Sequence, residues 1–410
     1  MKNFFDRNLI SIIQIIYILI FGSIFVFSLS YIINLWTYSE IHINYSQGFI
    51  RRGFLGQAIS ILTDFGFSKQ KFFSLLFFTF SIINSFIFLK IIKNKIKDVW
   101  IIIFFSFNPA LIIFPFFDLG GYARFEIFGI FLILVHTYLS IKTRDDHIHI
   151  ITYSKIYFYC LLPAIIISIL IHEINLLVIF FHLVTTYNLL KLKKINSSLH
   201  LIKYFSFLII LVPIALVFLT TTISDYSMLQ MYENLTDKEN VNLWIWKSIF
   251  QNLGQRNSEF LYMTNPIGNA LYYIFIFSFY LVPVIFIFKK NINFNLWKII
   301  TNILCIIPLL LLFYIGRDWG RWIHIIMMII FCYNIQFIEK TKPIQIFQKK
   351  NSNLLFIFLI IFQISFTRIP HCCNLIEKKI NIIGGAIPKI VMLERIIFNK
   401  INIKSRFKNF

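Results

Sequence analysis

Long apolar segments recur along the whole chain and are separated by short polar stretches. Most of them approach the roughly 20 residues that an α-helix needs to cross a hydrocarbon core about 30 Å thick. The pattern predicts helices over residues 9–34, 72–92, 99–117, 125–141, 156–172, 174–190, 201–221, 270–288, 298–315, 322–338 and 353–368. We therefore expect an all-α polytopic integral membrane protein with about eleven transmembrane helices, within a range of roughly 10–12.

The composition of the 410-residue chain agrees with this expectation, because 58% of its residues are hydrophobic and only 14% are charged. Soluble domains carry about 25% charged residues. A cytosolic enzyme, a disulfide-stapled secreted domain and a disordered regulator are therefore excluded.

The net charge of +21 comes from basic residues that are unevenly divided between alternate loops. Lys and Arg concentrate in the loops on the same side as the N-terminus, which the positive-inside rule assigns to the cytoplasm. No nucleic-acid partner is expected, because no recognition fold interrupts the apolar segments. The abundance of Phe, Ile, Asn and Lys is typical of a low-GC bacterial gene, so we expect a bacterial inner (cytoplasmic) membrane.

Residues 1–368 are predicted to form a single transmembrane domain with two long periplasmic loops, at 37–71 and 222–268. Within the first loop, residues 53–64 have apolar positions at helical spacing but are too few to span. They predict a helix that lies in the outer membrane interface. Residues 369–410 form a basic C-terminal tail, for which an interfacial segment and a reversed helix around 380–398 remain open alternatives.

Ionisable side chains cluster at the outward ends of the predicted spans, while the span interiors are nearly free of charge. Such residues are costly in a membrane and indicate function by default. The clusters contain Glu40, Arg51 and Arg52; Asp118, Arg124 and Glu126; His172 and Glu173; and Arg317, Asp318 and Arg321. Because all four clusters belong to the same face, we expect them to share one pocket. The single His136, His182 and His324 are interpreted as core residues.

The residue types in these clusters suit an anionic, sugar-bearing substrate. The arginines match phosphate oxygens bidentately, and are predicted to bind a substrate phosphate: Arg51, Arg52, Arg124, Arg317 and Arg321. One carboxylate could act as a general base on a hydroxyl, and the catalytic candidates are Glu40, Asp118, Glu173 and Asp318. Accessory or sugar-contacting roles are predicted for His172, Glu126, Trp319 and Trp322, and Trp36 and Tyr122 supply further flat rings. No cofactor and no metal are expected.

A purely structural interpretation stands beside this one. Arg51 and Arg52 could anchor the loop to anionic head groups. Asp118 with Arg124, or Asp318 with Arg317, could form ion pairs that only cap short turns.

The chain resembles the polytopic polymerases and transferases of bacterial surface-polysaccharide clusters, particularly the O-antigen polymerases of lipopolysaccharide synthesis. The resemblance rests on the length, the number of spans, the long outward loop and the outward arginines, including the runs GFIRRG (48–53) and GRDWGRW (316–322). The chain is also similar to membrane glycosyltransferases that use polyprenyl-phosphate sugars, in which a juxtamembrane helix and an essential acid occupy the first outward loop; residues 53–64 and Glu40 match these features.

The resemblance implies a glycosyltransferase-C-like fold and the polymerisation of a polyprenyl-(di)phosphate-linked glycan at the periplasmic face, within the lipid bilayer and beside other polysaccharide-assembly proteins. The alternatives are a single-sugar transferase and, from another class, a lipid-linked oligosaccharide flippase or transporter.

Overall fold

A computed structural model describes residues 2–30, 35–46, 52–66, 68–117, 124–193, 225–235, 241–250, 266–292, 296–315 and 318–338, together with 357–358, 361–363 and 369. None of the described residues forms a β-strand. Seven of the described helical segments are long and apolar enough to cross a membrane: Asn8–Leu29, Lys69–Lys95, Glu126–Arg144, Ile150–Ile171, Glu173–Leu192, Ala270–Lys289 and Leu296–Phe313. The chain is therefore an all-helical, multi-pass membrane protein.

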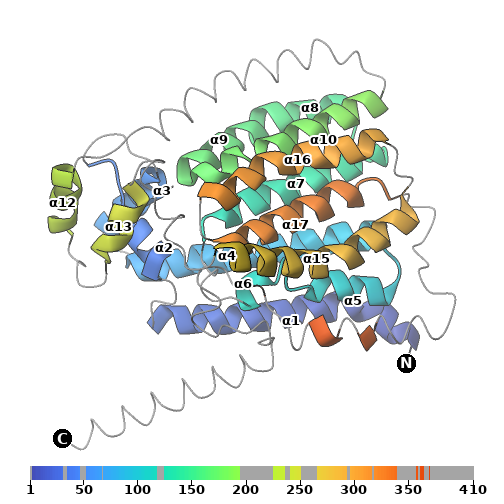
Figure 1. Cartoon of the computed structure of the whole chain (residues 1–410), viewed down its shortest axis with the longest axis horizontal. Coiled ribbons are helices and arrows are strands. Elements are labelled where there is room, and N and C mark those ends of the chain that lie inside the picture. The colour runs from blue at the N-terminus through green and yellow to red at the C-terminus, as the bar shows by residue number, and fades with distance from the viewer. Residues whose placement is uncertain are drawn as a thin grey trace, which may run out of the picture.

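The main bundle is built from long helices that run roughly side by side (Figure 1). They are α1 (Lys2–Ser30), α4 (Lys69–Lys95), α7 (Glu126–Arg144), α8 (Ile150–Ile156), α9 (Leu162–Ile171), α10 (Ile179–Leu192), α15 (Pro266–Asn291), α16 (Leu296–Ile315) and α17 (Trp319–Ile335). A π-helical turn, Tyr157–Leu161, joins α8 to α9, and a 3₁₀ turn, Glu173–Leu176, follows α9. The shorter helices are α2 (Leu35–Glu40), α3 (Gly53–Asp64), α5 (Val99–Phe107), α6 (Phe114–Phe117), α12 (Asp225–Glu233) and α13 (Leu243–Phe250).

The seven candidate spans coincide with seven of the predicted ones. The other predicted spans either differ in extent from the helices observed or lie outside the described residues. The predicted span 99–117 is not one helix, because α5 ends at Phe107 and a turn precedes α6. The turn begins at Asn108, whose Oδ1 accepts the backbone N–H of Ala110 at 2.9 Å, and Pro109 has no N–H with which to continue the helix. The predicted spans 201–221 and, for the most part, 353–368 lie outside the described residues.

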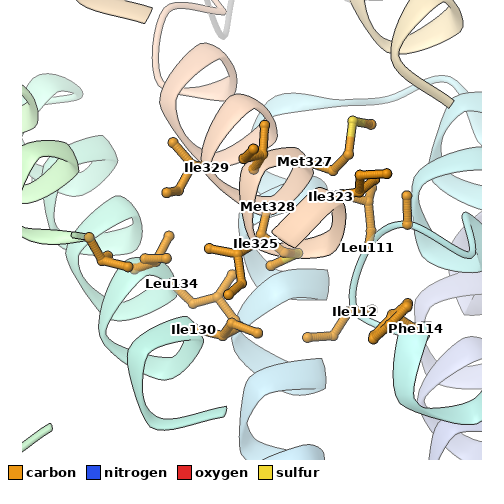
Figure 2. Packing of buried hydrophobic residues seen from close by; sticks show 14 of the residues in the cluster. Leu111, Ile112, Phe114, Ile130, Leu134, Ile323, Ile325, Met327, Met328 and Ile329 are labelled. Carbon is orange, nitrogen blue, oxygen red and sulfur yellow. The ribbon is translucent and has the colours of Figure 1, made fainter. Parts of the chain in front are cut away.

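Helix α17 lies at the centre of the bundle and corresponds to the predicted span 322–338. It has only 17 residues, and all of them are buried. Figure 2 shows its side chains between Ile130 and Leu134 of α7 on one side and Leu111 and Ile112 of the turn after α5 on the other. A helix that is apolar all round is expected to be enclosed by its neighbours in this way. Its first turn carries Arg321 to the end of the bundle where the candidate site lies.

The opposite end of the bundle is basic. Lys95, at the end of α4, forms a largely buried ion pair with Asp145, and its Nζ lies 2.9 Å from Oδ1. Arg144, at the end of α7, donates from Nη1 to the carbonyl of Gln336 at 3.1 Å and lies over the ring of Phe337. This end contains residues that the sequence assigns to the cytoplasm, and that orientation remains a prediction.

Helices α2, α3, α12 and α13 lie together at the other end, beyond the long helices (Figure 1), and we call them the outer cap. Trp246 of α13 is fully buried, and its Nε1 donates to the backbone carbonyl of Ser39 at 2.7 Å. Helix α3 has the bounds that the sequence predicts. Only glycine fits at position 56, because the backbone of α3 lies very close to Ile43 there. A Cβ on Gly56 would lie 1.9 Å from the carbonyl oxygen of Ile43. Both long outward loops thus contribute helices to one structure.

Candidate functional site

Arg52 links a carboxylate of the outer cap, Glu40, to a carboxylate of the bundle, Glu173. Its Nε donates to Glu173 Oε2 at 2.9 Å, its Nη2 lies 2.5 Å from Glu173 Oε1, and its Nη1 pairs with Glu40 Oε1. Arg52 immediately precedes α3 with a φ of 63°, in the left-handed region that is uncommon for a residue with a side chain. Burial lowers the pKa of Arg52, but the negative charges of Glu173 and Glu40 outweigh it and raise the pKa above its ordinary value. The guanidinium is therefore a permanent positive charge with two negative partners.

A second group of ion pairs forms around Arg321, in the first turn of α17. Its Nη2 lies 2.6 Å from Glu126 Oε1, and its Nη1 lies 3.2 Å from Asp318 Oδ2. Glu126 begins α7, where the positive end of the helix dipole favours a carboxylate. Its Oε2 is buried and accepts no hydrogen bond within the described part of the chain. Asp318 is the most exposed of these carboxylates, with 26% of its side chain accessible.

His172 lies between the two groups of ion pairs. It ends α9, and its Nδ1 accepts the backbone N–H of Ile174 at 3.3 Å, so in the neutral ring the proton is assigned to Nε2. That nitrogen lies 3.9 Å from Glu126 Oε1. Burial, together with the nearby charge of Arg52, lowers the pKa of His172 below 6.5. The ring is therefore neutral at pH 7 and adds no charge beside Glu126.

Arg124 lies beside a tryptophan of the outer cap. Its guanidinium carbon is 5.5 Å from the ring centre of Trp36, and the Nε1 of Trp36 donates to Glu40 Oε1 at 2.7 Å. Burial, followed by the like charge of Arg321, lowers the pKa of Arg124 to about 10. Arg124 thus remains cationic at pH 7 in a position where a further negative group would stabilise it.

The structure therefore brings most of the predicted site residues to one end of the bundle. They are Glu40, Arg52, Arg124, Glu126, His172, Glu173, Asp318 and Arg321. The predicted residues Arg51, Asp118 and Arg317 lie outside the described ones. Among the described members, three arginines face four carboxylates, so this part of the cluster carries no excess of positive charge.

A small cavity of about 40 Å³ opens beside the charged cluster. Its polar wall contains Arg124, Glu126, Arg321 and His324, and its apolar wall includes Phe77 and Phe114. Glu40, Glu173 and Asp318 are not among the lining residues. The cavity has room for only a few water molecules. A substrate phosphate could enter only if some of the surrounding ion pairs opened.

Two further predicted side chains are enclosed. Trp319 is 5% exposed and packs against Tyr273 and Phe313, and Trp322 is 4% exposed beneath the guanidinium of Arg321. Neither presents an open ring to a sugar in this conformation. The burial arises because α17 is surrounded on all sides.

Sequence reasoning assigned no role to His324, which lines the cavity. Its ring stacks on Phe114 with centroids 4.6 Å apart, and its Nδ1 lies 3.0 Å from the carbonyl of Ala110. One signal was available, because His324 follows Arg321 by three residues and so shares its helix face. Phe77 and Phe114 come from apolar runs in which nothing distinguishes them from other core residues.

No protein-family model matches the chain, and neither a curated protein nor a solved structure matches it. Within the described residues, no group of three or more His, Cys, Asp or Glu side chains is arranged to hold a metal ion. The function must therefore be argued from the charged cluster itself.

Proposed function

We propose that this protein is a membrane glycosyltransferase that acts at the periplasmic face of the bacterial inner membrane on polyprenyl-(di)phosphate-linked sugars, and specifically a polymerase of surface-polysaccharide repeat units. The proposal includes a glycosyltransferase-C-like arrangement of about eleven spans with the N-terminus in the cytoplasm. The observation that carries it is the joining of Arg124, Glu126 and Arg321 in one cavity wall, at the helix ends of one face.

The placement of these groups favours an enzyme over a carrier. Secondary transporters bind their substrates near the bilayer midplane, between repeated and broken helices. Here Glu126 and Arg321 lie in the first turns of α7 and α17, and His172 lies at the end of α9. An enzyme that receives a lipid-linked donor laterally needs its reactive groups at such a face, where the phosphate of the carrier lies.

The excess of carboxylates over arginines among the described residues suggests how the donor would be recognised. An incoming phosphate must compete with a carboxylate for an arginine. Asp318 is the weakest competitor, because it is the most exposed of the four and its 3.2 Å contact with Arg321 is longer than the 2.6 Å contact of Glu126. In the proposed mechanism the donor phosphate replaces Asp318 at Arg321 and also binds Arg124. Arg52 keeps its two carboxylates and acts as a positioning residue.

In the proposed reaction, the carboxylate of Asp318 acts after it has been released from Arg321. Asp318 accepts the proton of an acceptor hydroxyl, and the hydroxyl oxygen forms a bond to the anomeric carbon as the bond between that carbon and the phosphate oxygen breaks. The lipid (di)phosphate leaves with the bonding electron pair, and Arg124 and Arg321 stabilise the charge that develops on it. Glu126 holds Arg321 in place through its 2.6 Å contact.

The test is gel analysis of surface glycans from a strain that lacks the gene and carries wild type, Arg321→Ala, Asp318→Asn or Arg144→Ala. Arg144→Ala is the matched control, since it removes an arginine from the other end of the bundle. We expect wild type and the control to restore a long-chain ladder, and the two site variants to leave a core with one repeat unit, at equal protein levels in the membrane.

Other patterns would change the assignment. A ladder that persists with a shifted repeat mass in the deletion strain would indicate a single-sugar transferase. Loss of all surface glycan, with lipid-linked units accumulating inside the cell, would indicate a flippase. An unchanged pattern on deletion, or full activity of both site variants, would refute the proposal.

A further inference from the structure

Two tryptophans from different outward loops meet at the edge of the charged cluster. Trp36 belongs to α2 and Trp244 to α13, and their ring centres lie 6.2 Å apart with the ring planes at 83°. Trp244 is 63% exposed, whereas Trp246, two residues later, is fully buried. We call this pair the tryptophan step.

The position of the tryptophan step is fixed from both sides. The Nε1 of Trp246 donates to the carbonyl of Ser39, and the backbone N–H of Asn242 donates to the hydroxyl of Ser39 at 3.1 Å, so α13 is held against α2. The Asn242 side chain also accepts the backbone N–H of Trp244 at 2.9 Å. The backbone that carries the exposed Trp244 ring is therefore fixed, so little backbone freedom is lost when a ligand binds.

One arginine side chain contacts both the tryptophan step and the cavity. Arg124 lines the cavity and also lies over the ring of Trp36. The indole N–H of Trp36 is donated to Glu40, which pairs with Arg52. Trp36 therefore donates its indole N–H within the charged cluster. The tryptophans of an interfacial belt instead direct their N–H groups to head groups and water.

We propose that the tryptophan step is a sugar-binding subsite, which receives a ring of the lipid-linked glycan while the lipid phosphate lies at Arg124 and Arg321. The C–H groups on one face of a sugar ring carry partial positive charge and pack on the negative face of an aromatic ring. Lys247 is exposed and lies three residues after Trp244 in α13, so its ammonium group shares that helix face and is available to the hydroxyls. The subsite takes over the role that the buried Trp319 and Trp322 cannot perform in this conformation.

This inference rests on the proposed function, and its test separates the two. The protein is reconstituted in nanodiscs, and dissociation constants are measured for two probes: the lipid-linked glycan extracted from the deletion strain, and the same polyprenyl diphosphate without sugar. The variants are Trp244→Ala, Trp244→Tyr, which keeps an aromatic ring, and Trp100→Ala. Trp100 is a matched control, because it is 39% exposed and lies near the start of α5, at the other end of the bundle.

We expect Trp244→Ala to weaken binding of the glycan carrier about tenfold and to leave binding of the sugar-free carrier unchanged. Trp244→Tyr should retain most of the affinity, and Trp100→Ala all of it. No effect of Trp244→Ala, or an equal loss for both probes as for a membrane anchor, would overturn the subsite while the proposed function stands. If the wild-type protein binds neither carrier, the proposed function fails and the subsite with it.

Discussion

Removal of the Arg52 side chain tests whether the outer cap is held to the bundle by charge. Arg52→Met keeps the length of an apolar side chain but leaves Glu40 and Glu173 without the guanidinium that both now contact. Their side chains are only 1% and 14% exposed, so water can replace little of what is lost. Breaking one partner of a buried ion pair costs about 3–5 kcal/mol. Because methionine inherits the same left-handed backbone, the strain of that conformation cancels in the comparison.

The measurement is the free energy of unfolding of the purified protein, obtained by titration with SDS in mixed micelles. We expect Arg52→Met to lower it by about 3 kcal/mol, and the triple variant with Glu40→Gln and Glu173→Gln to recover all but about 1 kcal/mol, because the buried charges are then removed together. Arg144→Met is the control, since it removes a hydrogen bond worth about 1 kcal/mol at the other end of the bundle. A cost below about 1 kcal/mol for Arg52→Met, or no recovery in the triple variant, would refute the reasoning.

Two further outcomes are expected. Since the pKa of His172 is lowered in the folded protein, the unfolded chain binds its proton first as the pH falls below 6.5. The free energy of unfolding should therefore drop between pH 7.5 and 5.5, by at most about 1.4 kcal/mol per pH unit from this residue, and His172→Gln should show a shallower slope; equal slopes would contradict the assigned neutral ring. Gly56→Ala should lower the free energy of unfolding by about 2–3 kcal/mol, because α3 must move away from the Ile43 carbonyl. Gly22→Ala is its control, since a Cβ at that position of α1 meets nothing within 4 Å, and a similar loss in both variants would argue against the close approach.

Seven of the eleven predicted spans coincide with described helices that could cross a membrane, because length and apolarity alone decide whether a helix can do so. The prediction of a span fails where a single residue ends a helix inside an apolar segment. Pro109 ends a helix inside an apolar run, whereas Pro283 and Pro308 lie within α15 and α16. The difference arises from local partners, because the side chain of Asn108 bonds the backbone of the turn at the first site. A count of prolines cannot distinguish these cases.

The gathering of the site could be predicted because helix ends that alternate across a membrane return to the same face. The specific pairs could not. Arg52 and Glu173 are separated by 121 residues, and nothing in either local sequence indicates the other. Among the described residues Asp318 contacts Arg321, three positions later in the sequence, while Arg317, which the sequence also suggests as a partner, lies outside them. Helical phase decides this pairing, since residues three apart lie on one face.

The pairing of Arg321 with two carboxylates has a consequence for the proposed chemistry. If Asp318 were always free, it could activate water as readily as an acceptor hydroxyl, and the donor would be hydrolysed. While Asp318 is paired with Arg321, its Oδ2 is in contact with the guanidinium rather than with an acceptor hydroxyl. In the proposed mechanism, the donor phosphate replaces this partner at Arg321, so the base would become available only when the donor is in place. Glu126 keeps its shorter contact with Arg321 throughout and so preserves the position of the guanidinium. An ion pair that first resembles a structural cap can thus couple donor binding to the release of the base.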